Sequence, residues 1–150
     1  MTFETFFSYS DPEEAFLDQN LAKLGDCLVN LIYSLARSVA RETPDGAKAP
    51  NRVLSESLNK AGLRDLAPSR SDRHDLGDVA EAIIAYAWLQ GKIDIEEAAE
   101  ILSESFHGVN FDNRKKIFNA AEKGFENLLK TIAERISFEK EKISRNKAGD

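Results

Sequence analysis

Three carboxylates in two separate segments of the chain have the residue types and spacing of a metal site. Asp26 follows Gly25 in an apolar stretch, and Asp78 and Glu81 lie three residues apart in a second one. On a helix, residues three apart project from one face and can converge on one cation. Three carboxylates completed by water suit Mg2+, a hard cation with octahedral oxygen coordination. Such a site can activate water and stabilise charge on a phosphodiester.

Gly25 gives a reason to place the two segments side by side. Glycine inside a helix costs about 1 kcal/mol relative to alanine, so a helix keeps it where another backbone must approach closely. Ala82 and Ala85 are the small residues of the second segment that could pack against it. A crossing at Gly25 would bring Asp26 near the two acidic residues of the second segment, where burial of an unpaired charge would be costly.

A simpler interpretation of the same residues stays open. An aspartate followed three residues later by a glutamate is common on solvated helix faces, and a motif alone is only a hypothesis. In that case the chain is an all-helical, oligomeric protein-interaction module whose carboxylates only form ion pairs. The separation of the Asp26, Asp78 and Glu81 side chains distinguishes the two interpretations.

The first long element is expected to be one helix, with a bend allowed near Asn20. Residues 11–14 (Asp-Pro-Glu-Glu) have the N-cap, the proline and the acidic first turn of a helix start. The turn residues 43–46 end the helix after about Arg41. Apolar steps of four and three residues predict one buried stripe, which consists of Leu17, Leu21, Leu24, Leu28, Leu31 and Leu35.

Capping residues, glycine stops and apolar spacing predict four further helices and no strands. The helix that carries Asp78 has a wide apolar stripe and is expected at the centre of the fold, after a polar loop over residues 68–74. The four helices are expected from about Asn51 to Gly62, from Leu76 to about Gln90 with Asp75 as N-cap, from Asp94 to Gly108, and from Asp112 or Asn113 into a charged tail that frays from about Lys140.

Composition predicts a single all-α domain over residues 1–150, since 42% of the residues are hydrophobic and 31% are charged. No apolar run approaches the ~20 residues that span a bilayer, and the N-terminus does not resemble a secretory signal. The lone Cys27, expected as a small buried residue, fits a reducing compartment, and we expect a cytoplasmic protein. The net charge of −6 means that any contact with nucleic acid has to be local.

Taken together, the two acidic segments resemble the motifs of the ribonuclease III family. Residues 24–29 (Leu-Gly-Asp-Cys-Leu-Val) are similar to its signature helix, in which Leu-Gly-Asp leads into apolar residues. Residues 78–86 (Asp-Val-Ala-Glu-Ala-Ile-Ile-Ala-Tyr) are similar to its second motif, Asp-x-x-Glu-Ala-Leu-Ile-Gly-Ala. The resemblance covers roughly residues 17–89, and the order of the motifs and the all-helical setting agree with it.

The resemblance implies a ribonuclease III endonuclease-like helical bundle that processes RNA. It implies a hydrolase that acts as a homodimer on structured or double-stranded RNA, with Mg2+, or Mn2+ as the alternative ion. Asp26, Asp78 and Glu81 would then be the metal-binding catalytic carboxylates. Duplex RNA is recognised through its shape, phosphates and 2′-hydroxyls, so no sequence-reading motif is expected.

Basic residues near the motifs are the candidates for RNA contact. The expected loop just before the second motif contains Arg70, Arg73 and His74, which could meet a phosphate backbone there. Alternatively, these residues only form part of a solvated loop, which is where arginine usually lies. Further basic residues lie beyond the first motif and at the start of the last helix: Arg37, Arg41, Lys48, Arg114, Lys115 and Lys116.

The chain also departs from the family's pattern. Ala22 stands where the signature has a glutamate, Gln19 replaces a second one, and Ala85 replaces a glycine. Asp18 could substitute in part for the missing acids. The alanine at position 22 is similar to the minimal, Mini-III-like form, which lacks a double-stranded RNA-binding domain, for which the 150 residues leave no room. A non-catalytic family member that binds RNA or a protein partner is therefore the alternative function.

Overall fold

The computed structural model describes residues 9 and 11–148 of the chain, and their side chains up to residue 137. Helices and connecting loops make up this part of the chain, with no strand in it, which confirms the predicted all-α fold class. The elements are α2 (Pro12–Phe16), α3 (Gln19–Arg41), α4 (Asn51–Lys60), the 3-10 turn η1 (Arg64–Leu66), α5 (Arg73–Leu89), α6 (Ile95–Glu104) and α7 (Arg114–Ala148).

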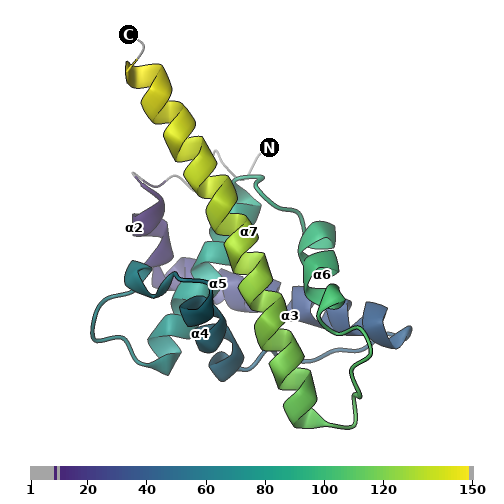
Figure 1. Cartoon of the computed structure of the whole chain (residues 1–150). Coiled ribbons are helices and arrows are strands. Elements are labelled where there is room, and N and C mark those ends of the chain that lie inside the picture. The colour runs from purple at the N-terminus through teal and green to yellow at the C-terminus, as the bar shows by residue number, and fades with distance from the viewer. Residues whose placement is uncertain (1–8, 10, 149–150) are drawn as a thin grey trace.

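Helix α5 is the centre of the bundle, as its wide apolar stripe predicted. It packs against α2, α3, α4 and α7, while α6 contacts α3 and α7. The long α7 runs diagonally across the other helices in Figure 1. The core of this packing is formed by fully buried side chains from every long helix, among them Ile32, Leu58, Ile83, Ile84, Leu102, Phe125 and Leu128.

The prediction of one continuous helix from Pro12 to Arg41 was wrong. The segment is divided, because α2 ends at Phe16 and α3 begins at Gln19. The Asp18 carboxylate accepts from the backbone N–H groups of Asn20 and Leu21, at 2.9 and 3.4 Å. Those N–H groups have no partner inside a helix, so the cap stabilises a new helix start at this point.

The leucine stripe on this segment was also partly wrong. Leu21 and Leu28 are buried, but Leu17, Leu24, Leu31 and Leu35 are between 37% and 49% exposed. Small and β-branched side chains form much of the buried face of α3, because they let it approach α5 and α6 closely. That face consists of Leu21, Ala22, Gly25, Leu28, Val29, Ile32, Tyr33 and Ala36.

Helix α5 begins three residues earlier than predicted. Asp72, not Asp75, is its N-cap, and the two aspartates form a reciprocal capping box with N–H to carboxylate distances of 2.9 and 3.0 Å. Arg73 and His74 therefore belong to the first turn of α5 and not to a loop. The expected stop at Gly62 is confirmed by its φ of +78°.

The remaining boundaries agree with the predictions within a few residues. Helix α6 ends at Glu104, before the expected stop at Gly108, and α7 begins at Arg114. The backbone of α7 is helical to Ala148, so the fraying expected from about Lys140 stays a prediction. Within the described part of the chain, the helices lack the combination of length and apolar composition that a membrane span requires.

Candidate active site

Helices α3 and α5 cross at Gly25, as its place in an apolar helix predicted. A Cβ atom at this position would lie 2.2 Å from the carbonyl oxygen of Glu81 and 3.0 Å from its Cβ. Real Cβ atoms do not approach backbone so closely, so the crossing requires glycine. The nearest backbone is that of Glu81 itself, and not that of Ala82 or Ala85. The crossing therefore joins one acidic segment to the other.

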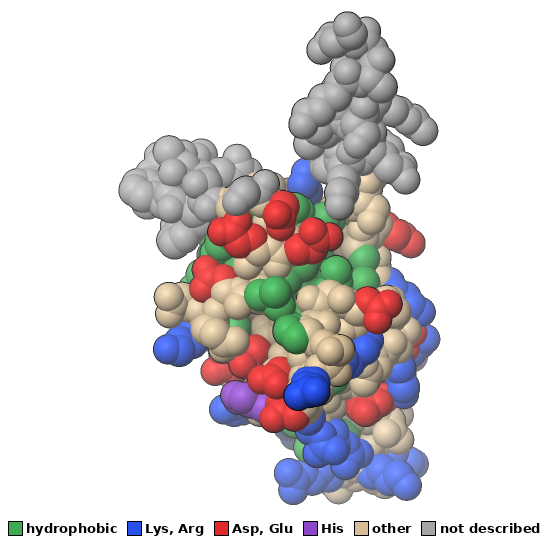
Figure 2. All heavy atoms as spheres, turned by 90° about the vertical axis from the view of Figure 1, so that its left-hand side faces the viewer, with side chains coloured by type: hydrophobic (Ala, Val, Ile, Leu, Met, Phe, Trp, Pro, Cys, Tyr) green, Lys and Arg blue, Asp and Glu red, His purple; other side chains and the backbone are tan. Residues whose placement is uncertain are grey.

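Asp26, Asp78 and Glu81 line one solvent-open hollow of about 310 Å³ beside this crossing. The structure thus brings together the three carboxylates that the sequence put forward from two distant segments. Figure 2 shows a histidine beside a group of acidic side chains on one face of the molecule, with lysine and arginine side chains gathered below them. The other residues that line the hollow are Gln19, Ala22, Lys23, Lys48, Asn51 and His74.

Glu81 is the most buried of the three carboxylates, at 4% exposure. Burial raises its pKa to about 8; the negative charge of Asp26, a hydrogen bond between the two side chains and the charge of Asp78 add to the shift. The cation of Lys48 acts in the opposite direction. A carboxyl group whose pKa is raised by burial and by neighbouring negative charge lies in an environment that favours a bound cation.

The other two carboxylates differ in their partners. Burial raises the pKa of Asp78, while His74 opposes the shift; the His74 Nε2 lies 3.7 Å from the Asp78 Oδ2. Asp26 Oδ1 accepts a hydrogen bond of 3.4 Å from the Nδ2 of Asn30, one turn further along α3. Among the described side chains, none of the three forms an ion pair with an arginine, and Asp78 pairs with His74.

The residues of the hollow suit a hard divalent cation in their chemistry, since three carboxylates line it together with the amide-bearing residues Gln19 and Asn51. No group of three His, Cys, Asp or Glu residues within the described part of the chain already has the geometry of a metal centre. The case for a metal here thus depends on the chemistry of the three carboxylates, the burial of Glu81 and the solvent-open hollow that they share.

The predicted RNA-contact residues lie in three different settings. His74 lines the acidic hollow. Arg70 lines a second hollow of about 290 Å³, which shares Gln19, Ala22 and Asp78 with the first. Arg73 is exposed in the first turn of α5. The two hollows therefore adjoin one another.

Asp18 does not replace the acids that the signature lacks. Its Oδ1 caps α3, and its Oδ2 accepts a hydrogen bond of 3.0 Å from the Tyr9 hydroxyl. Its carboxylate lines the second hollow and not the acidic one. Cys27 was wrongly expected to be buried, because it lies on the exposed side of α3.

Lys48, Asn51 and Asn30 are the site residues that the sequence analysis did not single out. Lys48 was only one of several basic residues, and its place depends on the loop between α3 and α4. Asn51 begins α4, and Asn30 lies four residues after Asp26 on the same helix. That spacing of four residues was the one available signal, since residues four apart on a helix are neighbours.

A comparison with models of protein families matches residues 19–138 to the family described as Ribonuclease III. The match spans most of the chain, includes both acidic segments and continues through α6 and most of α7. A length of 150 residues is consistent with the minimal form of that family. A search of curated proteins finds no significant match.

Proposed function

Because the chain belongs to the ribonuclease III family, we propose that it is a divalent-metal-dependent endoribonuclease that cleaves structured or double-stranded RNA in RNA processing. The observation that carries this proposal is the open hollow that Asp26, Asp78 and Glu81 share. Three carboxyl groups from two helices meet there, and burial together with the negative charge of the other two raises the pKa of Glu81 to about 8.

Asp26, Asp78 and Glu81 would hold the ion, Mg2+ or Mn2+. When bound, the ion activates a water molecule and stabilises negative charge on the phosphodiester. Gly25 allows α3 to approach the backbone of Glu81 closely, which places Asp26 beside the second acidic segment. The Nδ2 of Asn30 orients the Asp26 carboxylate, and the burial of Glu81 restricts the access of bulk water to its oxygens.

The proposed contacts with RNA come from cations around the hollow. Lys23, Lys48 and His74 line it, and Arg70 lines the adjoining hollow. These groups supply the local positive charge that a chain with a net charge of −6 requires to meet a phosphate backbone. Arg73, exposed next to His74 in the first turn of α5, is the remaining proposed contact.

A homodimer is part of the proposal, and its support is the exposed apolar stripe of α3. Leu24, Leu31, Leu35 and Val39 are between 37% and 64% exposed and follow one another at helical spacing. A contiguous exposed apolar face of this kind marks an interaction surface. The stripe lies on a different side of α3 from Asp26. A second copy of the chain could therefore cover the stripe and leave the acidic hollow of each copy open. The proposed location is the cytoplasm, where a lone thiol stays reduced.

The second candidate function is RNA binding without cleavage. The observation that favours it is that Gln19 and Ala22 line the acidic hollow at the positions where the family's signature has glutamates. A site with fewer carboxylates could bind an RNA phosphate and a metal ion and still fail to hydrolyse the bond.

Incubation of a short RNA duplex with Mg2+ tests the proposal. The wild type is compared with Asp26→Asn, Glu81→Gln and the control Glu56→Gln, which removes an exposed carboxylate from α4. We expect both site variants to lose at least ~10²-fold of the cleavage rate and the control to match the wild type. Equal cleavage by all four proteins would overturn the assignment. Duplex binding by the wild type without Mg2+-dependent products would favour the second candidate.

A further inference from the structure

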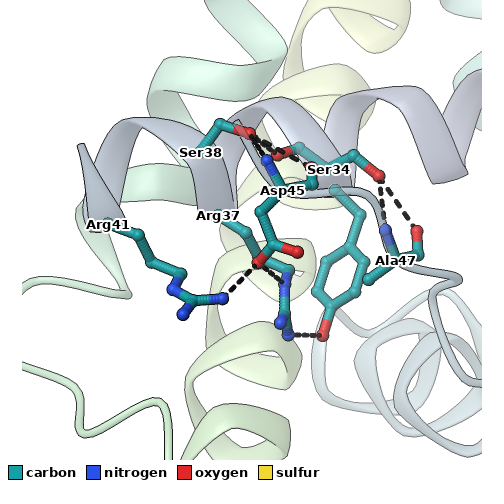
Figure 3. A network of polar contacts seen from close by, with 7 residues as sticks. Ser34, Arg37, Ser38, Arg41, Asp45 and Ala47 are labelled. Atoms are coloured by element: carbon teal, nitrogen blue, oxygen red, sulfur yellow. Dashed lines mark hydrogen bonds and ion pairs between the residues drawn. The ribbon is translucent and has the colours of Figure 1, made fainter. Parts of the chain in front are cut away.

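A row of polar side chains on α3 holds the segment that leads into α4. Asn30, Ser34 and Ser38 follow one another at intervals of four residues, so they lie along one side of the helix. They bind the backbone of residues 45–49, which we call the strap, and Figure 3 shows the two serine contacts. The Ser38 hydroxyl accepts from the Asp45 N–H (2.8 Å), the Ser34 hydroxyl accepts from the Ala47 N–H (2.9 Å), and the Asn30 Oδ1 accepts from the Ala49 N–H (2.8 Å).

The order of these contacts along α3 shows that the strap runs toward the acidic hollow. Its first residue lies against Ser38 and its last against Asn30, so it runs antiparallel to α3 and ends one helical turn from Asp26. Alternate residues of the strap are bound to α3. Lys48, which lies between two bound residues, is exposed and lines the hollow.

The far end of the strap is anchored by charge. The Oδ2 of Asp45 accepts from the Nε of Arg37 at 2.8 Å and from the Nη1 of Arg41 at 3.1 Å, as Figure 3 shows. The Arg37 guanidinium also lies 5.4 Å from the ring centroids of Tyr33 and Phe111. Arg37 and Arg41 are therefore bound to Asp45 at the far end of the strap. Lys48 is the cation of the strap that lies beside the carboxylates.

Asn30 is the one residue of the row that contacts both the strap and the site. Its Oδ1 accepts from the Ala49 N–H, and its Nδ2 donates to the Oδ1 of Asp26 at 3.4 Å. One amide therefore fixes the end of the strap beside Lys48 and the orientation of Asp26. Asparagine suits this position because its side chain has a donor and an acceptor.

We propose that Lys48 binds a phosphate of the RNA substrate at the acidic hollow, and that Asn30 is the positioning residue that holds the strap and so places Lys48 there. This inference deepens the proposed function and rests on it. Its observations are the hydrogen bonds along α3, the place of Lys48 in the hollow and its exposure to solvent. A cation at this point meets a phosphate that the three carboxylates alone would repel.

The experiment measures the affinity for a short RNA duplex at several salt concentrations, with Ca2+ in place of Mg2+ to slow cleavage. We expect Lys48→Gln to weaken binding several-fold and to lower the slope of log affinity against log salt by about one. Lys48→Arg should keep the slope. Lys123→Gln is the control, because it removes the same charge from α7, where Lys123 pairs with Glu126.

A double-mutant cycle tests the role of Asn30. If Asn30 acts by placing Lys48, Asn30→Ala should weaken duplex binding, and the double variant Asn30→Ala/Lys48→Gln should bind no more weakly than Lys48→Gln. Hydrogen exchange should show that Asn30→Ala loses protection at the Ala49 amide while the core amides of α5 keep theirs. A purely structural role would instead give additive losses of affinity.

The outcomes separate this inference from the proposed function. A wild type that cleaves duplex RNA, with Lys48→Gln retaining the wild-type slope and affinity, would overturn the role of Lys48 alone. Additive losses in the cycle would overturn the role of Asn30. A wild type that neither binds nor cleaves duplex RNA would overturn the proposed function and this inference with it.

Discussion

Gly25 of α3 lies so close to Glu81 of α5 that a single added methyl group would come within 2.2 Å of the Glu81 carbonyl oxygen. The next residue after Gly25 is Asp26, and the side chain of Glu81 points into the same hollow. The close helix crossing and the acidic cluster are therefore one structural feature. The distance between the two helices sets how near the carboxylates can come to one another.

Gly25→Ala should destabilise the fold, because the new methyl group forces α3 and α5 apart. We expect a loss of about 1–3 kcal/mol in the free energy of unfolding, as for overpacked cores, measured by urea denaturation. The matched control is Gly77→Ala on α5, where the nearest atom to a new Cβ is the Asn51 Oδ1 at an ordinary 3.5 Å. Alanine there should stabilise the helix by up to ~1 kcal/mol. Equal effects of the two substitutions would contradict the tight crossing.

Glu81 should make the metal-free protein less stable as the pH rises. Its pKa is raised from 4.5 to about 8 in the folded chain, so between these values the folded state keeps a proton that the unfolded state releases. The free energy of unfolding therefore falls from about pH 4.5 to about pH 8; below this window the penalty is absent and above it the penalty is complete.

Glu81→Gln tests this pH dependence directly. The neutral glutamine side chain should remove the fall in the free energy of unfolding with pH. In EDTA at pH 8, the free energy of unfolding of the variant should therefore exceed that of the wild type by ~1 kcal/mol or more. Added Mg2+ should narrow the difference, because it stabilises only the chain with the intact carboxylate cluster. Urea denaturation at pH 5, 6.5 and 8 measures the effect, and parallel pH profiles for the two proteins would speak against it.

Asp45→Asn should loosen the anchored end of the strap. Burial opposes ionisation of Asp45, but hydrogen bonds from Arg37 and Arg41 outweigh it and hold its pKa below the ordinary 3.8. Its contribution to stability is thus present above pH 3.8 and is lost as the pH falls through the lower folded value. We expect Asp45→Asn to lower the free energy of unfolding by about 1–3 kcal/mol at pH 7, and this loss should shrink below pH 3.8. The control is Asp65→Asn, at an exposed aspartate of η1, which should leave the free energy of unfolding unchanged at pH 7 and below pH 3.8.

Leu31→Glu should disrupt the proposed homodimer, because it places a charge in the middle of the exposed apolar stripe of α3. Sedimentation velocity should report a dimer for the wild type and a monomer for the variant, whose helical content is unchanged. Asn59→Glu adds the same charge to an exposed site on α4 and should remain dimeric. A wild type that sediments as a monomer at every concentration would contradict the proposed interface.

The sequence singled out the three carboxylates that the structure brings together, because each belongs to a local pattern. Gly25 in an apolar helix marked a close crossing, and the three-residue spacing of Asp78 and Glu81 marked one helix face. By contrast, the position of Lys48 depends on hydrogen bonds between the strap and side chains of α3, in which the two partners lie up to 19 residues apart in the sequence. No periodicity encodes such contacts between a loop and a helix.

The leucine stripe shows a second limit of sequence patterns. Leucines at steps of three and four residues have the same spacing whether they face the core or an exposed surface. Here Ala22 and Gly25 determine which face of α3 is buried, because close packing of α3 requires small side chains on its inner face. The break at Asp18 was missed for a related reason, since the apolar spacing continues through the residues where the backbone leaves the helix.

Titration with Mn2+ at pH 8, followed by electron paramagnetic resonance, tests most directly whether the three carboxylates share one ion. The account predicts saturable binding to the wild type and to Glu56→Gln. It predicts affinity at least ~10-fold weaker for Asp26→Asn, Asp78→Asn and Glu81→Gln, each measured singly. Equal Mn2+ affinity in all five proteins, or no saturable binding to the wild type, would contradict it.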